Sequence, residues 1–354
     1  MTFAEVRAAV EPVDREAAGA ARDRQSQLTK PPGSLGALED LGVQLAAIAG
    51  EVPPPVPAPV TIAVFAADHG VVAEGVTAWP QDVTGQMLAN FATGGAAINV
   101  LGRGLGVDIV VVDVGVATDL AASLPGIVDK RVRRGTRNFA DEPAMTPAET
   151  TAALDVGAAV AVEAVTAAAA RMLITGDMGI GNTTAATALI AAITGTDPRS
   201  IVGRGAGADD ANVARKAEVI SGALARIASP ADAFTVLGEV GGLEIAALVG
   251  YITAGAAHRV PVLLDGLIAD AAALVAVQLT PGVRDYLIAG HRSAEPAAAV
   301  ALEHLQLTPI IDMSLRLGEG SGAALAAPIV QAAARILGEM ATFDSAGVSR
   351  KIEE

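Results

Sequence analysis

Residues 172–184 read MLITGDMGIGNTT, and this stretch decides the fold class. Its apolar beginning, Met172 to Thr175, is typical of a short buried strand. The glycine-rich residues 176–181 then predict a loop, and the alanine-rich residues 185–193 predict a helix. A strand, a loop and a helix in this order form the first part of a βαβ unit, in which a helix joins two parallel strands.

The same succession recurs along most of the chain. Five further apolar runs each precede a loop with Gly or Asp, and buried parallel strands are expected to read as such continuous apolar runs. We therefore predict an α/β fold with an open, doubly wound, mostly parallel, Rossmann-like sheet. Ligands of such sheets bind beyond the carboxyl ends of the strands, where these loops lie. The further runs are Val60–Ala66, Ile109–Val114, Phe234–Leu237, Val260–Leu264 and Tyr286–Ala289.

Two more helices are predicted outside this succession. Leu35–Ala49 carries apolar side chains at three- and four-residue spacing, and Ser34 precedes it in the position of an N-cap. The proline-rich segment Val52–Pro59 predicts an extended connector, which marks a boundary in the chain. The long apolar stretch Ala323–Met340 predicts a helix that follows the sheet and packs with the N-terminal helix.

The composition limits the classes of function. The 24 Lys and Arg residues against 39 Asp and Glu give a formal net charge of −15, which argues against nucleic-acid binding. Hydrophobic residues make up 52% and aromatic residues 3%, so we expect a core of small aliphatic side chains with close helix packing. The absence of cysteine excludes disulfides, thiolate nucleophiles and cysteine-ligated metals, and it favours a reducing, cytoplasmic setting.

Neither a signal peptide nor a membrane-spanning helix is expected. Charged residues such as Arg7 and Glu11 interrupt the start of the chain. Farther on, charges such as Glu163 and Glu244 break the apolar stretches before they reach the roughly 18 residues that a membrane helix needs. We therefore expect a soluble protein without a membrane partner.

The loop Gly176–Thr184 is a candidate phosphate site. Its glycines let backbone N–H groups converge, and the start of the following helix adds a partial positive charge. No Gly-Lys-Ser/Thr sequence follows, so the loop is not of the kind that binds nucleoside triphosphates. The alternative is a tight turn that only Asn182 or Thr183 caps.

A second glycine-rich loop, Val202–Gly207, precedes a stretch that contains Arg215 and Lys216. In an acidic chain such basic side chains are candidates for holding an anionic substrate, with Lys216 as a point charge on phosphate. The alternative is a solvated helix face.

Glu319 stands between Gly318 and Gly320, just before a stretch of small residues. Burial among apolar neighbours raises the pKa of a carboxyl group, as a general base that works near neutral pH requires. The alternative is that Glu319 only complements the dipole of the following helix.

Two histidines also follow predicted strands, in Asp68-His69-Gly70 and in Gly290-His291-Arg292-Ser293. We expect hydrogen-bonding roles for them, because no second histidine lies at a metal-ligand spacing and no third ligand lies near.

Residues 79–87, WPQDVTGQM, contain the only tryptophan of the chain. Trp79 and Met87 are candidates for holding a flat aromatic substrate. The alternative for a single tryptophan is a place in the core.

Taken together, these motifs resemble the nicotinate-nucleotide:dimethylbenzimidazole phosphoribosyltransferase family of cobalamin synthesis. The resemblance spans nearly the whole chain, and the order of its motifs makes it specific. The motifs are TKPPGSLG (29–36), ADHGV (67–71), MGIGNTT (178–184), PVLLDG (261–266) and RLGEGSGAA (316–324).

The resemblance implies transfer of phosphoribose from nicotinate mononucleotide to 5,6-dimethylbenzimidazole, which gives α-ribazole 5′-phosphate and nicotinate. It also implies a homodimer of chains with a large α/β domain, residues 53–320, and a small helical domain from both chain ends, residues 1–52 and 321–354. Small-molecule substrates are the expected partners, and neither a metal nor another cofactor is expected.

The resemblance also assigns site residues. The family's general base falls on Glu319. Its phosphate loop falls on Asp177, Met178, Gly179, Ile180, Gly181 and Asn182, and its phosphate lysine falls on Lys216. Arg204 and Gly205 of the second glycine-rich loop, and Asp265 after the predicted strand Val260–Leu264, are further candidates for phosphate and ribose contacts. The family's base pocket falls on Trp79, Val83, Gln86, Met87 and Leu317. Two positions depart from the family's pattern, which has Glu more often than Asp177 and a small polar residue more often than Trp79.

In the implied mechanism, Glu319 takes the N–H proton of the attacking benzimidazole while the bond to the cationic pyridine ring breaks with inversion at C1′. Asp177 and Asp265 are expected to stabilise the cationic ribosyl centre. A carboxylate-dependent nucleotide hydrolase and a non-catalytic sensor of benzimidazole ribotides are the alternatives. An aromatic acceptor site argues against the hydrolase, and turnover separates the enzyme from the sensor.

Overall fold

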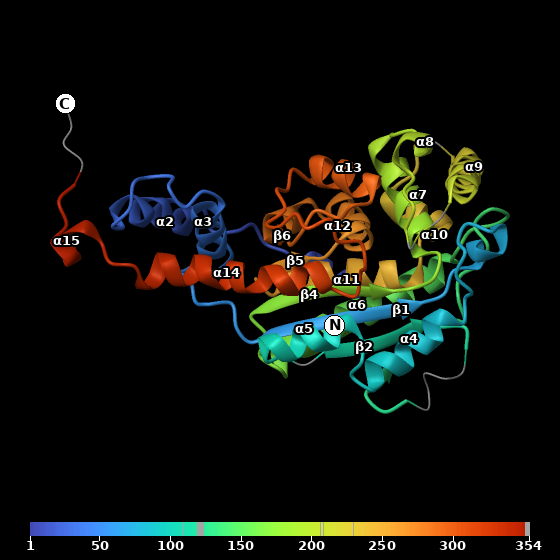
Figure 1. Cartoon of the computed structure of the whole chain (residues 1–354), viewed down its shortest axis with the longest axis horizontal. Coiled ribbons are helices and arrows are strands. Elements are labelled where there is room, and N and C mark those ends of the chain that lie inside the picture. Colours follow the sequence, from blue (N-terminus) through green and yellow to red (C-terminus); the bar gives the residue numbers. More distant parts are fainter. Residues whose placement is uncertain (108, 119–123, 206, 208, 229, 351–354) are drawn as a thin grey trace.

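The computed structural model describes residues 1–107, 109–118, 124–205, 207, 209–228 and 230–350. Its centre is a six-stranded sheet in the order β3-β2-β1-β4-β5-β6 (Figure 1). Every neighbouring pair is parallel, so the prediction of an open, doubly wound α/β fold is confirmed. The direction of winding reverses between β1 and β4. The strands are β1 (Val60–Ala67), β2 (Ile109–Gly115), β3 (Ile127–Asp129), β4 (Met172–Met178), β5 (Val262–Leu264) and β6 (Leu287–Ala289).

Helices cover both faces of the sheet, and each face has its own apolar core. Phe65 of β1 belongs to the first core and Val64 to the second, because successive side chains of a strand point to opposite faces. The first core includes residues of α1 (Phe3–Ala8), α6 (Pro147–Thr166), α7 (Asn182–Thr194), α8 (Pro198–Ile201), α9 (Asp210–Arg226), α10 (Ala233–Val240), α11 (Leu243–Ala257), α12 (Leu267–Leu279) and α13 (Pro296–Leu305). The second includes residues of α3 (Ala37–Ala49), α4 (Val83–Ala92), α5 (Ala97–Leu105) and α14 (Ser321–Glu339). Shorter elements are the 3₁₀ helices η1 (Gly70–Glu74) and η3 (Pro281–Tyr286) and the helix α15 (Phe343–Ala346).

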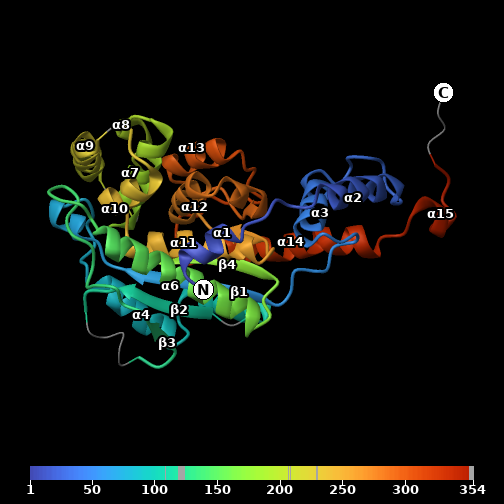
Figure 2. The same ribbon diagram turned by 180° about the vertical axis from the view of Figure 1, so that it is seen from behind.

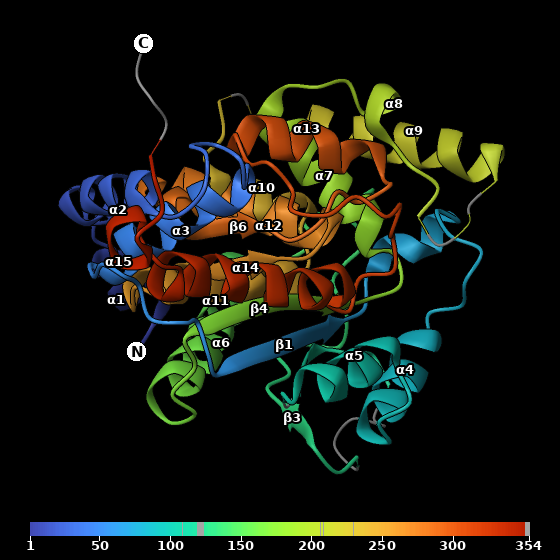
Figure 3. The same ribbon diagram turned by 60° about the vertical axis from the view of Figure 1, so that its left-hand side comes forward.

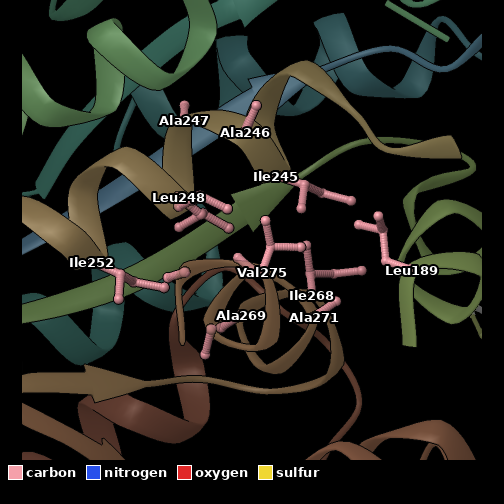
Figure 4. Packing of buried hydrophobic residues seen from close by; sticks show 14 of the residues in the cluster. Leu189, Ile245, Ala246, Ala247, Leu248, Ile252, Ile268, Ala269, Ala271 and Val275 are labelled. Atoms are coloured by element: carbon pink, nitrogen blue, oxygen red, sulfur yellow. The ribbon is translucent and has the colours of Figure 1, made fainter. Parts of the chain in front are cut away.

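Small aliphatic side chains let the helices of the first core pack closely. Ile245 and Leu248 of α11 face Ile268 and Val275 of α12, and the same core continues to α7 (Figure 4). On the other side of α11, the backbone of Gly157 in α6 lies so near the carbonyl group of Ala247 that a methyl group there would overlap it. The aliphatic core that the composition predicts is therefore present, and glycine permits its closest helix contact.

The two ends of the chain pack against each other. α2 (Arg15–Gln27) and α3 form a third apolar cluster with Leu337 near the end of α14 (Figures 1 and 2). Arg24 of α2 donates hydrogen bonds to the carbonyl groups of Leu337, at 2.5 Å, and Gly338, at 3.0 Å. The predicted packing of the C-terminal helix with the N-terminal helix is thus confirmed. The opposite half of α14 lies along the sheet, where Ala323 and Val330 belong to the second core (Figure 3).

Two elements differ from the prediction. Phe234–Leu237, expected as a strand, lies inside helix α10, which Asp232 caps by accepting the N–H of Thr235 at 2.7 Å. Four apolar residues in a row do not distinguish a buried strand from a buried helical turn. The edge strand β3 was not predicted, because it has three residues, and Val128 and Asp129 in it are exposed.

Helix α3 also begins later than predicted. Its N-cap is Gly36, which has a φ of +53°, and no side chain caps the helix. Glu39 instead reaches back and accepts the N–H groups of Gly33, at 3.2 Å, and Leu35, at 3.1 Å. Residues 33–36 therefore fold back on the first helical turn, and Ser34 is not the N-cap.

Among the described helices, α14 has the length and hydropathy of a membrane span. Core helices pass the same test, and 56% of this stretch is buried inside the structure. Length and hydropathy alone therefore do not distinguish α14 from a membrane span, and in this structure α14 packs on the sheet.

The core also contains an unpaired carboxyl group, which yields a prediction about stability. Asp270 of α12 is fully buried, and neither of its carboxylate oxygens has a hydrogen-bond partner among the described residues. Burial, and then the charge of Asp265, raise the pKa of Asp270 well above its ordinary value of 3.8. The unfolded chain therefore releases this proton at lower pH than the folded chain, so folding loses stability as pH rises from about 4.

We expect Asp270→Asn to remove this loss. The free energy of unfolding of the variant should exceed that of the wild type by about 1 kcal/mol or more at pH 8, and the difference should shrink toward pH 4. Urea denaturation at several pH values measures it, with the exposed Asp23→Asn as the matched control. A difference that is constant across pH, or equal in both variants, contradicts the prediction.

Candidate active site

The loops that follow β4, β5 and β6 meet around a cavity of about 320 Å³. The cavity lies beyond the carboxyl ends of the strands, as the sequence predicts for this sheet. It brings together many of the predicted site residues, which come from α4 and the segment before it, the end of β4 and the start of α7 with the loop between them, the second glycine-rich loop and the loop before α14. These are Trp79, Val83, Met87, Asp177, Met178, Gly179, Ile180, Asn182, Gly205, Leu317 and Glu319.

A smaller hollow of about 50 Å³ adjoins this cavity, and both include Trp79, Gly179 and Ile180 in their walls. Its floor is the N-terminus of α7, where Gly181 is the N-cap with a φ of +95° and no side chain caps the helix. The alternative of a turn capped by Asn182 or Thr183 is therefore not what the structure shows. An uncapped helix start with a positive φ at its glycine suits an anion.

Lys216 and Arg204 form the cationic wall of the hollow. Lys216 is 4% exposed, and its ammonium group donates a hydrogen bond to Thr183 Oγ1 at 3.1 Å. Burial lowers the pKa of Lys216, and the carboxylate of Glu295 opposes this shift. Lys216 is thus not on a solvated helix face, whereas Arg204 is largely exposed and pairs with Asp210.

Glu319 occupies a strained and buried position. Its φ is +64°, and it lies between Gly318 and Gly320, whose φ values are +84° and +89°. Its carboxylate accepts the N–H of Ile98 in the first turn of α5 at 3.2 Å. Burial, and then the charge of Asp265, raise the pKa of Glu319. The carboxylate therefore contacts α5 rather than the start of α14, and its raised pKa is that of a candidate general base.

Asp177 lies beside Glu319 at the end of β4. Its carbonyl accepts the N–H of Glu319 at 3.2 Å, and its carboxylate accepts a hydrogen bond from Asn182 at 3.0 Å. Burial, and then the charges of Asp265 and Glu244, raise the pKa of Asp177 well above its ordinary value. The free protein therefore favours the neutral form of Asp177 more than an exposed carboxyl group would.

Two predicted contact residues line neither the cavity nor the adjoining hollow. Asp265 is fully buried, and its carboxylate accepts N–H groups of Gly320, Gly322 and Ala323 at 2.7 to 3.1 Å, which fixes the start of α14. Gln86 is on the exposed side of α4, while Met87 lines the cavity, because neighbouring residues of a helix point in different directions.

The apolar wall of the cavity contains Trp79, Val83, Met87 and Leu317. Trp79 is 49% exposed and Leu317 is 59% exposed, so both form the rim rather than the core. The alternative of a core tryptophan is wrong. A wall of aromatic and aliphatic groups at the mouth of a cavity suits a flat apolar ligand.

Sequence reasoning missed two residues that hold the second glycine-rich loop. Glu295 accepts the N–H of Gly205 at 2.8 Å, and Arg316 donates to the carbonyl of the same residue at 2.7 Å. Both line the cavity. Their partner is a backbone group far along the chain, so no local pattern marks them. Ala206 of this loop lies outside the described residues.

The two histidines have hydrogen-bonding or ionic partners. His69 Nε2 lies 2.7 Å from Glu244 Oε1, and His291 Nε2 lies 3.5 Å from Asp265 Oδ1. No group of three or more His, Asp or Glu side chains that could hold a metal is present in the described part of the chain.

Comparisons with known proteins show similarity along nearly the whole chain. A family model described as phosphoribosyltransferase matches residues 10–348. The nicotinate-nucleotide–dimethylbenzimidazole phosphoribosyltransferase of Salinispora tropica is 53% identical over 358 residues, which cover 97% of this chain and 98% of that protein. The protein of the same name from Chloroflexus aurantiacus is 52% identical over 342 residues, covering 96% and 97%.

A solved structure is also similar. The crystal structure of the like-named enzyme from Thermus thermophilus has a TM-score of 0.91 and 48% sequence identity, and the match covers 96% of this chain and 100% of that one.

Close packing behind Glu319 yields a prediction. A methyl group on Gly176 would lie 2.7 Å from the carbonyl oxygen of Glu319 and 3.0 Å from Val64 Cγ2. Because a backbone atom and a buried strand side chain cannot both move aside, Gly176→Ala should displace Glu319 and lower the free energy of unfolding by about 1–3 kcal/mol.

Denaturation and a crystal structure of the variant measure these effects. The control is Gly222→Ala in α9, where a methyl group meets nothing within 4 Å. It should leave stability unchanged or raise it by up to about 1 kcal/mol. The prediction is contradicted if Gly176→Ala is as stable as the wild type and Glu319 keeps its position.

Proposed function

The chain belongs to the nicotinate-nucleotide–dimethylbenzimidazole phosphoribosyltransferase family, and from this premise we propose its reaction and the residues that carry it out. It transfers the phosphoribosyl group of nicotinate mononucleotide to a ring nitrogen of 5,6-dimethylbenzimidazole. The products are α-ribazole 5′-phosphate, used for the lower ligand of cobalamin, and nicotinate.

One observation supports this most directly: the cavity and the hollow that adjoins it bring together three different chemical environments. The uncapped start of α7 and the buried Lys216 suit the phosphate. The wall that contains Trp79 and Leu317 suits a flat benzimidazole. The buried Glu319 lies in the same cavity, with a raised pKa.

Glu319 acts as the general base. The lone pair of one benzimidazole nitrogen attacks C1′, and the bond from C1′ to the pyridine nitrogen breaks with its electron pair going to that ring. The leaving ring loses its positive charge in this step, so it needs no proton from an acid. Glu319 accepts the N–H proton of the attacking base, which leaves the product neutral at that ring. Its hydrogen bond from Ile98 orients the carboxylate for this transfer.

Asp177 responds to the charge of the substrate. A cationic pyridine ring or ribosyl centre near Asp177 opposes the rise in its pKa that burial and neighbouring carboxylates cause. Binding of a cation therefore favours the ionised form of Asp177, and this carboxylate stabilises the positive charge that develops at the ribosyl centre. Asp265 acts indirectly and does not contact the substrate. It fixes the start of α14 and therefore the position of the loop that carries Glu319.

The proposal also covers the oligomeric state and the cellular location. From the family we infer that the chain forms a homodimer in the cytoplasm. The exposed apolar side chains of Leu317, Met313 and Leu325 at and near the loop before α14 support an interface there. The separate apolar cluster of α2, α3 and the end of α14 supports a small domain from residues 1–52 and 321–354 beside the large domain, residues 53–320.

The reaction is tested by following both products. Purified protein is incubated with nicotinate mononucleotide, with and without 5,6-dimethylbenzimidazole, and nicotinate and α-ribazole 5′-phosphate are separated by chromatography. We expect nicotinate only when the base is present, in equal amount to the ribotide. Nicotinate without the base would identify a hydrolase, and ligand binding without turnover would identify a sensor.

Glu319→Gln tests the general base. The amide oxygen can still accept the N–H of Ile98, so the loop keeps its shape, but it cannot take a proton. We expect kcat to fall by about 10²–10⁴-fold, with the dissociation constant of nicotinate mononucleotide changed by less than about threefold. The control is Glu303→Gln on the exposed side of α13. Full activity of Glu319→Gln refutes the assignment.

A further inference from the structure

A fully buried imidazole and carboxylate lie beneath the phosphate loop, outside the residues that carry the proposed reaction. His69 follows β1, and Glu244 is in the first turn of α11; both are 0% exposed. Their side chains meet at 2.7 Å between Nε2 and Oε1. The partial positive charge at the start of α11 favours the carboxylate of Glu244, so α11 fixes the hydrogen-bond acceptor of the imidazole.

The imidazole is in direct contact with the phosphate loop. A methyl group on Gly179 would lie 3.4 Å from His69 Nε2, and one on Gly181 would lie 3.2 Å from His69 Cβ. These are the two glycines of the hollow at the start of α7. The space beside these two glycines is therefore bounded by His69, together with the carbonyl group of Ala67 and the side chain of Val72.

The opposite side of the ring is equally confined. A methyl group on Gly242, the N-cap of α11, would overlap His69 Cε1 and would lie 2.7 Å from Glu244 Oε2. The imidazole is thus held between the start of α11 and the loop at the start of α7. Because protein interiors are close-packed, a change in the ring's orientation must move one of these two backbones.

The neighbouring residue holds the same loop through a second route. Thr84 of α4 accepts the N–H of Ile180 at 3.1 Å, and its hydroxyl group opposes the rise in the pKa of Asp68 that burial causes. Asp68 in turn accepts the N–H of Ala117 at 2.8 Å. Thr84 bonds to the residue between Gly179 and Gly181, and His69 lies beside these two glycines.

We propose that His69, oriented by its hydrogen bond to Glu244, is a positioning residue for the substrate phosphate, because it supports the loop whose N–H groups face that phosphate. The proposal rests on the proposed function for the identity of the phosphate, which is that of nicotinate mononucleotide. It assigns no role in proton transfer to either residue. Its effect is on the binding of phosphate-bearing ligands and not on the benzimidazole.

The test compares Glu244→Ala with Glu244→Gln. The alanine removes the acceptor of His69, whereas the glutamine oxygen retains one of nearly the same shape. We expect Glu244→Ala to raise the KM for nicotinate mononucleotide by about tenfold or more, with the KM for 5,6-dimethylbenzimidazole unchanged. Glu244→Gln should stay within about threefold of the wild type for both substrates.

Tyr251→Phe is the matched control. It lies on the same helix α11, is fully buried, and loses a hydrogen bond to the carbonyl of Thr61 at 3.3 Å, far from the phosphate loop. It should leave both KM values unchanged. If Glu244→Ala does not fold, His69→Asn replaces it, since the shorter side chain keeps a polar group and withdraws the support from Gly179.

Titration calorimetry with inorganic phosphate separates this inference from the proposed function. Absence of turnover in the wild type would remove the proposed reaction, but weaker phosphate binding by Glu244→Ala would still support the positioning role. The inference is overturned if folded Glu244→Ala binds phosphate as the wild type does. It is also overturned if both KM values rise together, or if Glu244→Gln is as impaired as the alanine.

Discussion

The carboxylate of Asp265 joins the parts of the site that come from distant segments of the chain. It lies at the end of β5 and accepts three N–H groups from the start of α14, and its own N–H donates to Thr175 Oγ1 of β4 at 3.0 Å. The loop of Gly318 to Gly320 is held against β4 by this set of bonds. These N–H groups stabilise the buried carboxylate, which also lies 3.5 Å from His291 Nε2, and its field reaches the carboxyl groups around it. The raised pKa values of Glu319, Asp177 and Asp270 all include a contribution from Asp265.

Close backbone approach is the second constraint on this site. Gly176 passes the carbonyl group of Glu319, Gly318 passes the carboxylate of Asp177, and Gly179 passes the carbonyl of Ala67. In each case a side chain on the glycine would occupy space that a neighbouring group already fills. The same rule operates between α6 and α11, where Gly250 lies against the carbonyl of Leu154. The glycines of the motifs thus serve packing as much as flexibility, and they let reactive groups from three loops converge.

The sequence allowed the sheet to be predicted because its central strands are continuous apolar runs with glycine-rich ends. Where that contrast is missing the prediction fails: Phe234–Leu237 is as apolar as a strand yet helical, and β3 is short and exposed at the edge. Most of the candidate site was predictable. Glu319 and Asp177 each stand beside glycines, and Lys216 is a basic residue in an acidic chain. Glu295 and Arg316 were not, because each bonds to the peptide groups of Gly205, and a backbone partner leaves no pattern in the side chains. Asp265 was placed near the substrate because it follows a strand, but backbone N–H groups surround its carboxylate instead.

Helix α14 gives the chain ends a mechanical link to the reactive carboxylate. Its 19 residues form a helix about 28 Å long. The loop of Glu319 lies at one end, and the carbonyl groups that accept hydrogen bonds from Arg24 lie at the other. None of the described residues of α2 or α3 lines the cavity. They are nevertheless joined to the loop of Glu319 through a single helix, since α14 packs on α2 and α3 near its end and follows Glu319 and Gly320 at its start.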